Sequence, residues 1–184
     1  RFEKLLASKK YPVQVIWAGK PYAIDYPAIG DFNHLVHMSK NYANMAVCVG
    51  YELALSKRLK QASDLWLNNP RVPREASGTS GMTAAMNGAV NCSTNDGWIV
   101  EFINHGNNGF VVPPKDYDSM HVQEQDEYDL EQLYEILEKQ VLPAYYDNPH
   151  TWRQIVQNGM RDVRFQFDSN RMANEYYELL YNAS

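Results

Sequence analysis

The chain contains 184 residues, and 17 lysine and arginine side chains against 22 aspartate and glutamate side chains give a formal net charge of −5. This length is typical of one domain that buries a sizeable core without disulfides or metals. The chain has no apolar run of about 18 residues, which argues against a membrane span, and its acidic balance argues against nucleic acid as a bulk electrostatic partner.

The first part of the chain alternates short apolar runs with helical patterns. We expect strands at residues 13–19, 45–49 and 64–67, and helices at residues 29–40 and 52–62. Strand, helix, strand, helix, strand is the order of βαβ units, which predicts a mainly parallel sheet with helices on both faces. The sequence therefore predicts a single Rossmann-like α/β domain over residues 1–184.

Residues 68–88 form the most unusual segment. Its first half is rich in proline and asparagine, which predicts a loop. Its second half has small residues that predict the start of a helix, with Gly88 as its end. We expect a strand at 89–94 and a turn at Asp96-Gly97, followed by two apolar runs at 98–103 and 110–112 that a loop separates.

From Asp126 onward the pattern is helical, so we expect a helical tail at about 126–184. Asn148 and Pro149 predict the start of one helix, with asparagine as the N-cap and proline in the first turn. The last helix carries Met172, Tyr176, Leu179 and Leu180, which we expect to be core or packing residues.

Cys48 and Cys92 lie in apolar runs without metal-type spacing, so we expect buried, reduced thiols in a cytoplasmic protein. The five histidines have no paired spacing of the kind that binds metals, so we expect no metal site. The chain opens on Arg1 instead of methionine and runs at once into structured-looking sequence. We therefore expect it to be a piece of a longer polypeptide.

The helix entrance at Gly78-Thr79-Ser80-Gly81 is the segment with the clearest chemistry. The first amides of a helix have no intrahelical partners and lie beside the positive end of the helix dipole. The two glycines allow a ligand to approach the backbone, and Thr79 and Ser80 add hydroxyl donors. This pattern favours a phosphate or another oxyanion, although a plain N-cap turn has similar residues.

Glu75 stands three residues before Gly78, close enough to project into the same crevice. The preceding strand would place this crevice at the carboxyl end of a parallel sheet, where open α/β folds bind ligands. A carboxylate accepts hydrogen bonds from several hydroxyls, so a carboxylate beside an anion site suits a sugar phosphate. The alternative is that Glu75 is an exposed loop residue or a partner of the helix dipole.

Several ordered motifs identify a family resemblance, which is strong over roughly residues 11–114. They are Val13–Lys20, Asp64–Pro70, Glu75–Met82, Met86–Gly88 and Asp96–Trp98. Together they resemble the C-terminal domain of the short-type α-glucan (glycogen, maltodextrin) phosphorylases. The resemblance implies half of a two-domain retaining glycosyltransferase with the GT-B fold, whose active site lies between the domains. Its partners would be an α-1,4-glucan, phosphate or glucose 1-phosphate, and the polypeptide's own N-terminal domain.

The resemblance also implies roles for the residues at the helix entrance, but it assigns no catalytic residue. Glu75, Ser77 and Gly78 match positions that hold the hydroxyls of glucose, and Thr79, Ser80 and Gly81 match positions that cradle the phosphate of pyridoxal phosphate. Such enzymes use this cofactor through its phosphate group. The isolated 184 residues would be inactive, because half of the crevice is missing.

One position departs from the family pattern. The residue after Met82 is the family's lysine that forms the Schiff base with pyridoxal phosphate, and here it is Thr83, which has no amine. The nearest lysines are Lys60 and Lys115. Three interpretations stay open: non-covalent pyridoxal phosphate, a glucan synthase-type transferase that uses a nucleotide sugar, or a non-catalytic glucan-binding relative.

Three further residues near the proposed crevice have two interpretations each. Arg71 and Arg74 are either loop charges or contacts to substrate phosphate, and we favour loop charges. Trp98 either packs in the core or stacks on a sugar at the mouth of the crevice, and we favour the core.

Overall fold

The computed structural model describes residues 1–182. Its internal contacts divide the chain into two compact units, Arg1–Leu59 and Lys60–Ser184. The single Rossmann-like domain over residues 1–184 stays a prediction, and each unit is described by itself.

The first unit is a βαβ unit preceded by a short helix. Its elements are α1 (Phe2–Leu6), β1 (Val15–Ala18), α2 (Tyr26–Ser39), β2 (Met45–Cys48) and the greater part of α3 (Leu53–Ala62). The two strands pair in parallel, with Val15 opposite Met45. Helix α2 begins three residues before the predicted start at residue 29, because the Asp25 side chain accepts a hydrogen bond from the Ala28 amide at 3.1 Å and caps the helix.

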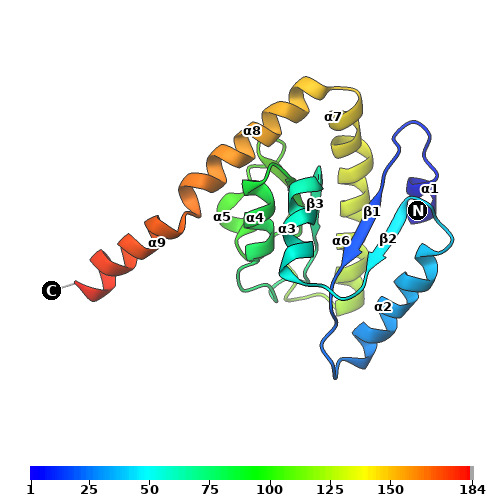
Figure 1. The fold of residues 1–184 in the computed structure, drawn as a ribbon, viewed down its shortest axis with the longest axis horizontal. Helices are drawn as coiled ribbons and strands as arrows, with labels where there is room; N and C mark the ends of the chain where they lie inside the picture. The colour runs from blue at the N-terminus through cyan, green and yellow to red at the C-terminus, as the bar shows by residue number, and fades with distance from the viewer. Residues whose placement is uncertain (183–184) are drawn as a thin grey trace. The chain divides into compact units, whose positions relative to one another are not determined.

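The second unit is built around three parallel strands in the order β3-β4-β5. Figure 1 labels β3 beside helix α4. Its elements are β3 (Leu65–Asn68), α4 (Thr79–Met86), β4 (Val90–Ser93), α5 (Ile99–Phe102), β5 (Gly109–Val111), α6 (Val122–Ile136), the π-helical turn η1 (Leu137–Val141), α7 (Leu142–Tyr146), α8 (Pro149–Gln166), α9 (Ser169–Tyr176) and the π-helical turn η2 (Tyr177–Tyr181). The order predicted for residues 13–67 is confirmed, because the chain runs through β1, α2, β2, α3 and β3 in turn. Within the described residues, the five strands form two parallel sheets, β1-β2 and β3-β4-β5.

Strand β4 is buried on both faces of this sheet. On one face, Val90 and Cys92 pack in a core with side chains from α6 and α8, including Ile136 and Trp152. On the other face, Asn91 donates a hydrogen bond from Nδ2 to the carbonyl of Gly81 in α4 at 3.2 Å. A second core joins residues of α4, α5 and α8: Ala85, Trp98, Ile99, Phe102 and Val163. Helices therefore cover both faces of the sheet, as the sequence predicts.

The two cysteines differ in burial, and both thiols are free. Cys92 is fully buried, and this burial raises the pKa of its thiol to about 12. Cys48 is only half-buried, so the prediction of a buried thiol is right for Cys92 and only partly right for Cys48. Across the described residues, we find no helix with the length and apolar character needed to cross a membrane.

Helical elements make up most of residues 122–181, and they begin before the helical tail that the sequence predicts at about 126–184. Helix α6 begins at Val122, four residues before Asp126. The Glu124 side chain accepts a hydrogen bond from the His121 amide at 3.1 Å and so caps the start of this helix. Helix α8 begins as predicted, because the Asn148 side chain accepts a hydrogen bond from the Thr151 amide at 3.2 Å.

The last helix is present, but its apolar face is not part of the core. In Figure 1, α9 leads away from the end of α8 toward the C-terminus. The side chains of Met172, Tyr176, Leu179 and Leu180 are between 51% and 74% exposed. The expectation that these are core or packing residues is therefore wrong, because amphipathic spacing indicates a helix without showing what covers its apolar face.

Candidate functional site

The predicted site lies at the carboxyl ends of β3 and β4 in the second unit. Residues 69–78 link β3 to α4, and residues 94–98 link β4 to α5. Two hydrogen bonds join these loops at their start: the Thr94 amide donates to the Asn68 carbonyl at 3.2 Å, and the Thr94 hydroxyl donates to the Pro70 carbonyl at 2.7 Å. The loops therefore meet at the edge of the sheet where α/β folds bind ligands.

The entrance of α4 depends on both of its glycines. Gly78 is the N-cap and has a φ of +91°, which favours glycine. Gly81 is buried in the first turn, where a Cβ atom would lie 2.8 Å from Asn91 Oδ1 and 2.9 Å from Trp98 Nε1. Helix α4 thus packs closely against β4 and Trp98 at the end where a helix leaves its first amide groups without intrahelical partners.

The structure brings the predicted site residues together. A Cβ atom on Gly78 would lie 2.9 Å from Glu75 Oε1, so the carboxylate lies directly beside the helix entrance. Glu75 is half-buried, while Ser77 and Thr79 are exposed and Ser80 is half-buried. A carboxylate, several hydroxyls and the amide end of a helix therefore share one small region. The ligand-binding roles of these residues stay predictions.

The Thr83 side chain lies on α4 and is engaged by its own helix. Its hydroxyl lies 3.0 Å from the carbonyl oxygen of Ser80 and 3.1 Å from that of Thr79, and it donates a hydrogen bond to them. The hydroxyl cannot form an imine, and residues 61–114 contain no lysine. The helix entrance fits the phosphate of pyridoxal phosphate, whereas the position of the Schiff base does not fit its aldehyde.

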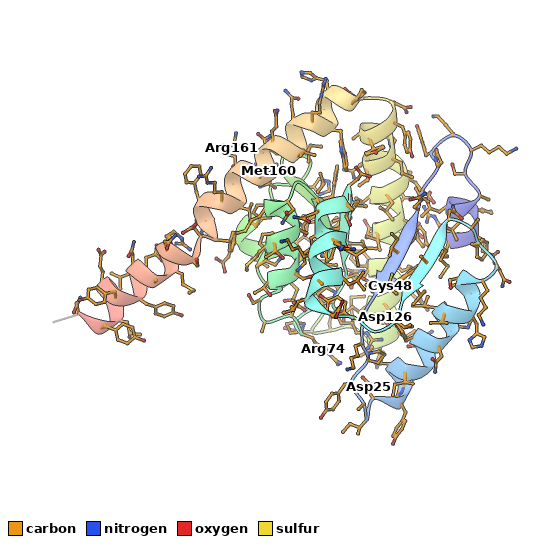
Figure 2. The ribbon with its side chains drawn as sticks, viewed as in Figure 1. Asp25, Cys48, Arg74, Asp126, Met160 and Arg161 are labelled. Carbon is orange, nitrogen blue, oxygen red and sulfur yellow. The ribbon has the colours of Figure 1, made fainter. Side chains whose placement is uncertain are left out.

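Arg71 forms part of a surface network. Its Nε and Nη2 atoms donate to the two carboxylate oxygens of Asp126 at 2.6 and 2.7 Å. This pairing lowers the pKa of Asp126 and raises that of Arg71. Arg74 is exposed, and its charge also lowers the pKa of Asp126. Both residues are labelled in Figure 2. The interpretation of Arg71 as a loop charge is therefore supported, because its guanidinium fastens the loop after β3 to the start of α6.

Trp98 is a core residue. Its side chain is 2% exposed and stacks on Phe102, with ring centroids 4.4 Å apart, and it meets Phe167 edge-on at 5.1 Å. The core interpretation is confirmed, and the alternative, stacking on a sugar at the mouth of the crevice, is not supported. Trp98 nevertheless supports the site, because its ring packs against Gly78 and Gly81.

Asp96 is the residue near the site that the sequence does not reveal. The Asp96-Gly97 pair predicts only a turn, but in the structure the Oδ2 atom of Asp96 accepts a hydrogen bond from the Glu75 amide at 2.8 Å. The two residues are 21 positions apart. No local pattern signals such a contact, because it depends on the pairing of β3 with β4.

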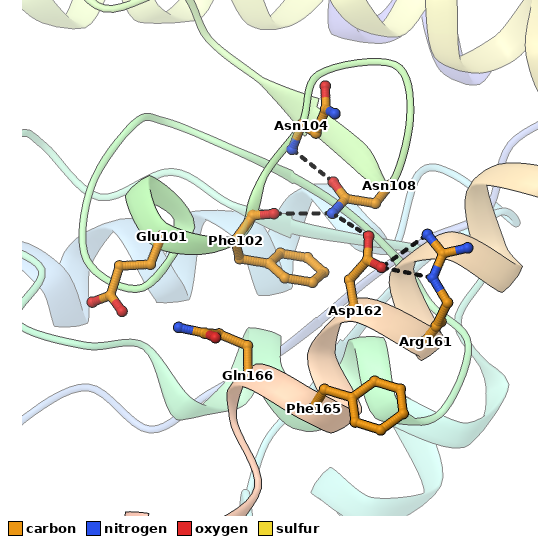
Figure 3. A pocket seen from close by; sticks show the side chains of 8 residues that line it. All are labelled: Glu101, Phe102, Asn104, Asn108, Arg161, Asp162, Phe165 and Gln166. Carbon is orange, nitrogen blue, oxygen red and sulfur yellow. Dashed lines mark hydrogen bonds and ion pairs between the residues drawn. The ribbon is translucent and has the colours of Figure 1, made fainter.

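A separate surface pocket of about 410 Å³ lies at the ends of α5 and α8 (Figure 3). Asn108 links its walls: Nδ2 donates to the Phe102 carbonyl at 2.9 Å and to Asp162 at 3.1 Å. The pocket is lined by Glu101, Phe102, Asn104, Asn108, Arg161, Asp162, Phe165 and Gln166. None of the predicted site residues lines it, so this pocket is distinct from the candidate site.

Comparison with solved structures defines the fold class. The chain resembles the crystal structure of Anabaena Alr3699/HepE in complex with UDP-glucose, with a TM-score of 0.64 over 92% of this chain and 41% of that one, at 16% sequence identity. The mixed α/β fold with parallel strands, predicted from the sequence as a Rossmann-like domain of the GT-B type, is confirmed. A family model for carbohydrate phosphorylases matches residues 37–143, which is more than half of the chain. The chain belongs to the carbohydrate phosphorylase family.

Two relatives extend this similarity to nearly the whole chain. Protein MJ1631 of Methanocaldococcus jannaschii is 41% identical over 94% of the chain, and the maltodextrin phosphorylase of Thermococcus litoralis is 32% identical over 99% of it. The chain spans 32% and 22% of the length of these two proteins. It therefore corresponds to only part of each relative.

Proposed function

We propose that the complete polypeptide that includes this chain transfers glucose between an α-1,4-glucan and phosphate, in glycogen or maltodextrin metabolism. Membership of the carbohydrate phosphorylase family supports this proposal. The observation that carries it is the position of Glu75, whose carboxylate lies beside Gly78 at the open entrance of α4. A hydrogen-bond acceptor for hydroxyls therefore lies next to a hydrogen-bond donor site for an oxyanion.

The two parts of the site would bind two different groups, the glucose unit of the substrate and the phosphate of the cofactor. Glu75, Ser77 and Gly78 would hold the sugar hydroxyls, and Thr79, Ser80 and Gly81 would hold a phosphate group. The physical basis is that a carboxylate accepts hydrogen bonds from hydroxyls but repels an anion, whereas helix amides attract one. The sugar is therefore favoured at Glu75, and the phosphate is favoured at the helix entrance.

The cofactor is part of this proposal. Pyridoxal phosphate, when bound, supplies a phosphate group that assists the transfer. Thr79, Ser80 and Gly81 would hold that group without a covalent bond, because Thr83 offers no amine. The hydroxyl of Thr83 is directed to the backbone of its own helix instead.

The remaining partner is a second domain of the same polypeptide. The active site would lie between that domain and this chain, so the 184 residues alone would show negligible turnover. We place the protein in the cytoplasm, on the basis of its two free thiols.

Thr83 also favours a second candidate function. A glucan synthase-type transferase that takes glucose from a nucleotide sugar needs no imine, and it would use the same carboxylate and helix entrance. The fold of HepE, whose structure contains UDP-glucose, is compatible with this candidate. The 16% identity supports the likeness of fold alone.

One set of assays separates these functions. The complete polypeptide is given maltodextrin with inorganic phosphate, or maltodextrin with UDP-glucose, each with and without added pyridoxal phosphate. We expect glucose 1-phosphate from the first mixture, its loss by at least about a hundredfold in Glu75→Gln, and no borohydride-trapped adduct within residues 61–114. Turnover of UDP-glucose alone would establish the second candidate, and glucan binding without any turnover would make the protein a non-catalytic relative.

A further inference from the structure

Asp96 holds two backbone amides at the candidate site. Its Oδ2 accepts a hydrogen bond from the Glu75 amide at 2.8 Å, and its Oδ1 accepts one from the Gly97 amide at 2.9 Å. The residue is only 9% exposed. Each carboxylate oxygen therefore accepts one hydrogen bond from the backbone. Hydrogen bonds to a charged carboxylate are stronger than those between neutral groups.

The next two residues hold the same loop at a second point. The Trp98 amide donates to the Ser77 carbonyl at 2.8 Å. Gly97 has a φ of +57°, and a Cβ atom there would lie 2.6 Å from the Ser77 carbonyl oxygen and 2.8 Å from Glu75 Cγ. Residues 96–98 thus lie flat against residues 75–77 and hold the loop at Glu75 and at Ser77.

The side chain of Trp98 makes this support rigid. It is buried against Phe102 and Phe167 and lies under Gly78 and Gly81. The turn that grips Glu75 is therefore anchored in the core of the second unit. A movement of residues 96–98 would require a movement of the core.

We propose that Asp96 is a positioning residue for the sugar subsite: by holding the Glu75 amide, it directs the Glu75 carboxylate to the space beside Gly78. This inference rests on the proposed function. The two hydrogen bonds of Asp96 go to Glu75 and Gly97, so its effect falls on the sugar subsite. The phosphate subsite at the helix entrance depends on the amides of α4.

The test compares two ligands on the complete polypeptide. Binding of glucose 1-phosphate and of inorganic phosphate is measured by calorimetry for the wild type, Asp96→Ala, Asp96→Asn and Asp168→Ala. Asp168 is a matched control, because its carboxylate also accepts two backbone hydrogen bonds, at the start of α9. We expect Asp96→Ala to weaken glucose 1-phosphate binding by roughly ten- to a hundredfold and to leave phosphate binding within about twofold.

The conservative variant guards against misfolding. The side-chain amide introduced by Asp96→Asn keeps one oxygen that can accept from the Glu75 amide, so we expect this variant to recover most of the binding of glucose 1-phosphate. We expect Asp168→Ala to bind both ligands as the wild type does. Amide hydrogen exchange followed by mass spectrometry gives a readout without ligand: the peptide that contains Glu75 exchanges faster in Asp96→Ala than in the wild type.

The outcomes separate this inference from the proposed function. A wild-type protein that binds no glucose 1-phosphate would overturn the proposed function, and the sugar role of Asp96 with it. If the wild type binds it and Asp96→Ala binds it equally well, or loses both ligands to the same extent, the positioning role alone is overturned. Unchanged exchange at Glu75 in Asp96→Ala would likewise contradict it.

Discussion

Two apolar segments of the second unit differ sharply in burial. In the turn and helix after β4, the side chains of Trp98, Ile99 and Phe102 are buried, between 1% and 7% exposed. In α9 and η2, by contrast, Met172 is 51% and Leu179 is 74% exposed. Both segments are rich in apolar residues, so their composition does not predict which of them is buried.

The difference comes from their neighbours in space. The segment after β4 extends a central strand and lies between α4 and α8, which bring apolar side chains from distant parts of the chain. Helix α9 follows the end of α8, and its main contacts among the described residues are with η2, its own continuation. An amphipathic pattern predicts a helix, but burial requires a second surface.

The largest expected effect comes from truncating one side chain in each segment. We expect Trp98→Ala to lower the free energy of unfolding by about 3–5 kcal/mol, because it leaves a large cavity in the core. We expect Leu179→Ala to change it by less than about 0.5 kcal/mol. Denaturant unfolding of the chain, followed by circular dichroism, measures both. A cost of several kcal/mol for Leu179→Ala would show that the apolar face of α9 and η2 is covered.

A glycine pair tests how tightly residues 96–98 hold the site. Gly97 and Gly106 both have positive φ, +57° and +75°, but of these two only Gly97 is placed so that an added Cβ would meet other atoms. Gly106→Ala should cost about 1–2 kcal/mol of unfolding free energy from backbone strain. Gly97→Ala should cost about 1–3 kcal/mol more. If Gly97→Ala and Gly106→Ala lose the same unfolding free energy, the loop at Ser77 moves aside for the added methyl group at little cost.

The smallest effect concerns the start of α9. The Asn170 and Arg171 amides donate to the Asp168 carboxylate, which lowers the pKa of Asp168. Because the folded-state pKa is the lower one, this cap stabilises the helix above the unfolded-state pKa and is lost as the pH falls through the folded-state pKa. Chemical shifts of residues 170–176 should therefore show less helix in Asp168→Ala than in the wild type at neutral pH. The two proteins should become alike in strong acid, and a difference that persists there would rule out this cap as the cause.

Local features of the chain were readable from the sequence. The order of strands and helices follows from the hydrophobic periodicity within each segment. The cap at Asn148 and the entrance of α4 between Gly78 and Gly81 depend on residues within about one helical turn of each other. The absence of an amine at Thr83 needs no structure at all. The early start of α6 was missed because its cap is formed by His121 and Glu124, a less common pairing than serine or threonine with glutamate.

The tertiary structure alone decided how the site is supported and which apolar side chains are buried. Asp96 meets Glu75 because β3 and β4 pair in parallel, which brings the loops at their carboxyl ends together across 21 residues of sequence. Trp98 lies in the core because α4 and α8 pack around it, and α8 comes from a distant part of the chain. The residue types that bind a ligand are set by the sequence, since their chemistry is local, whereas their orientation depends on contacts between segments that only folding brings together.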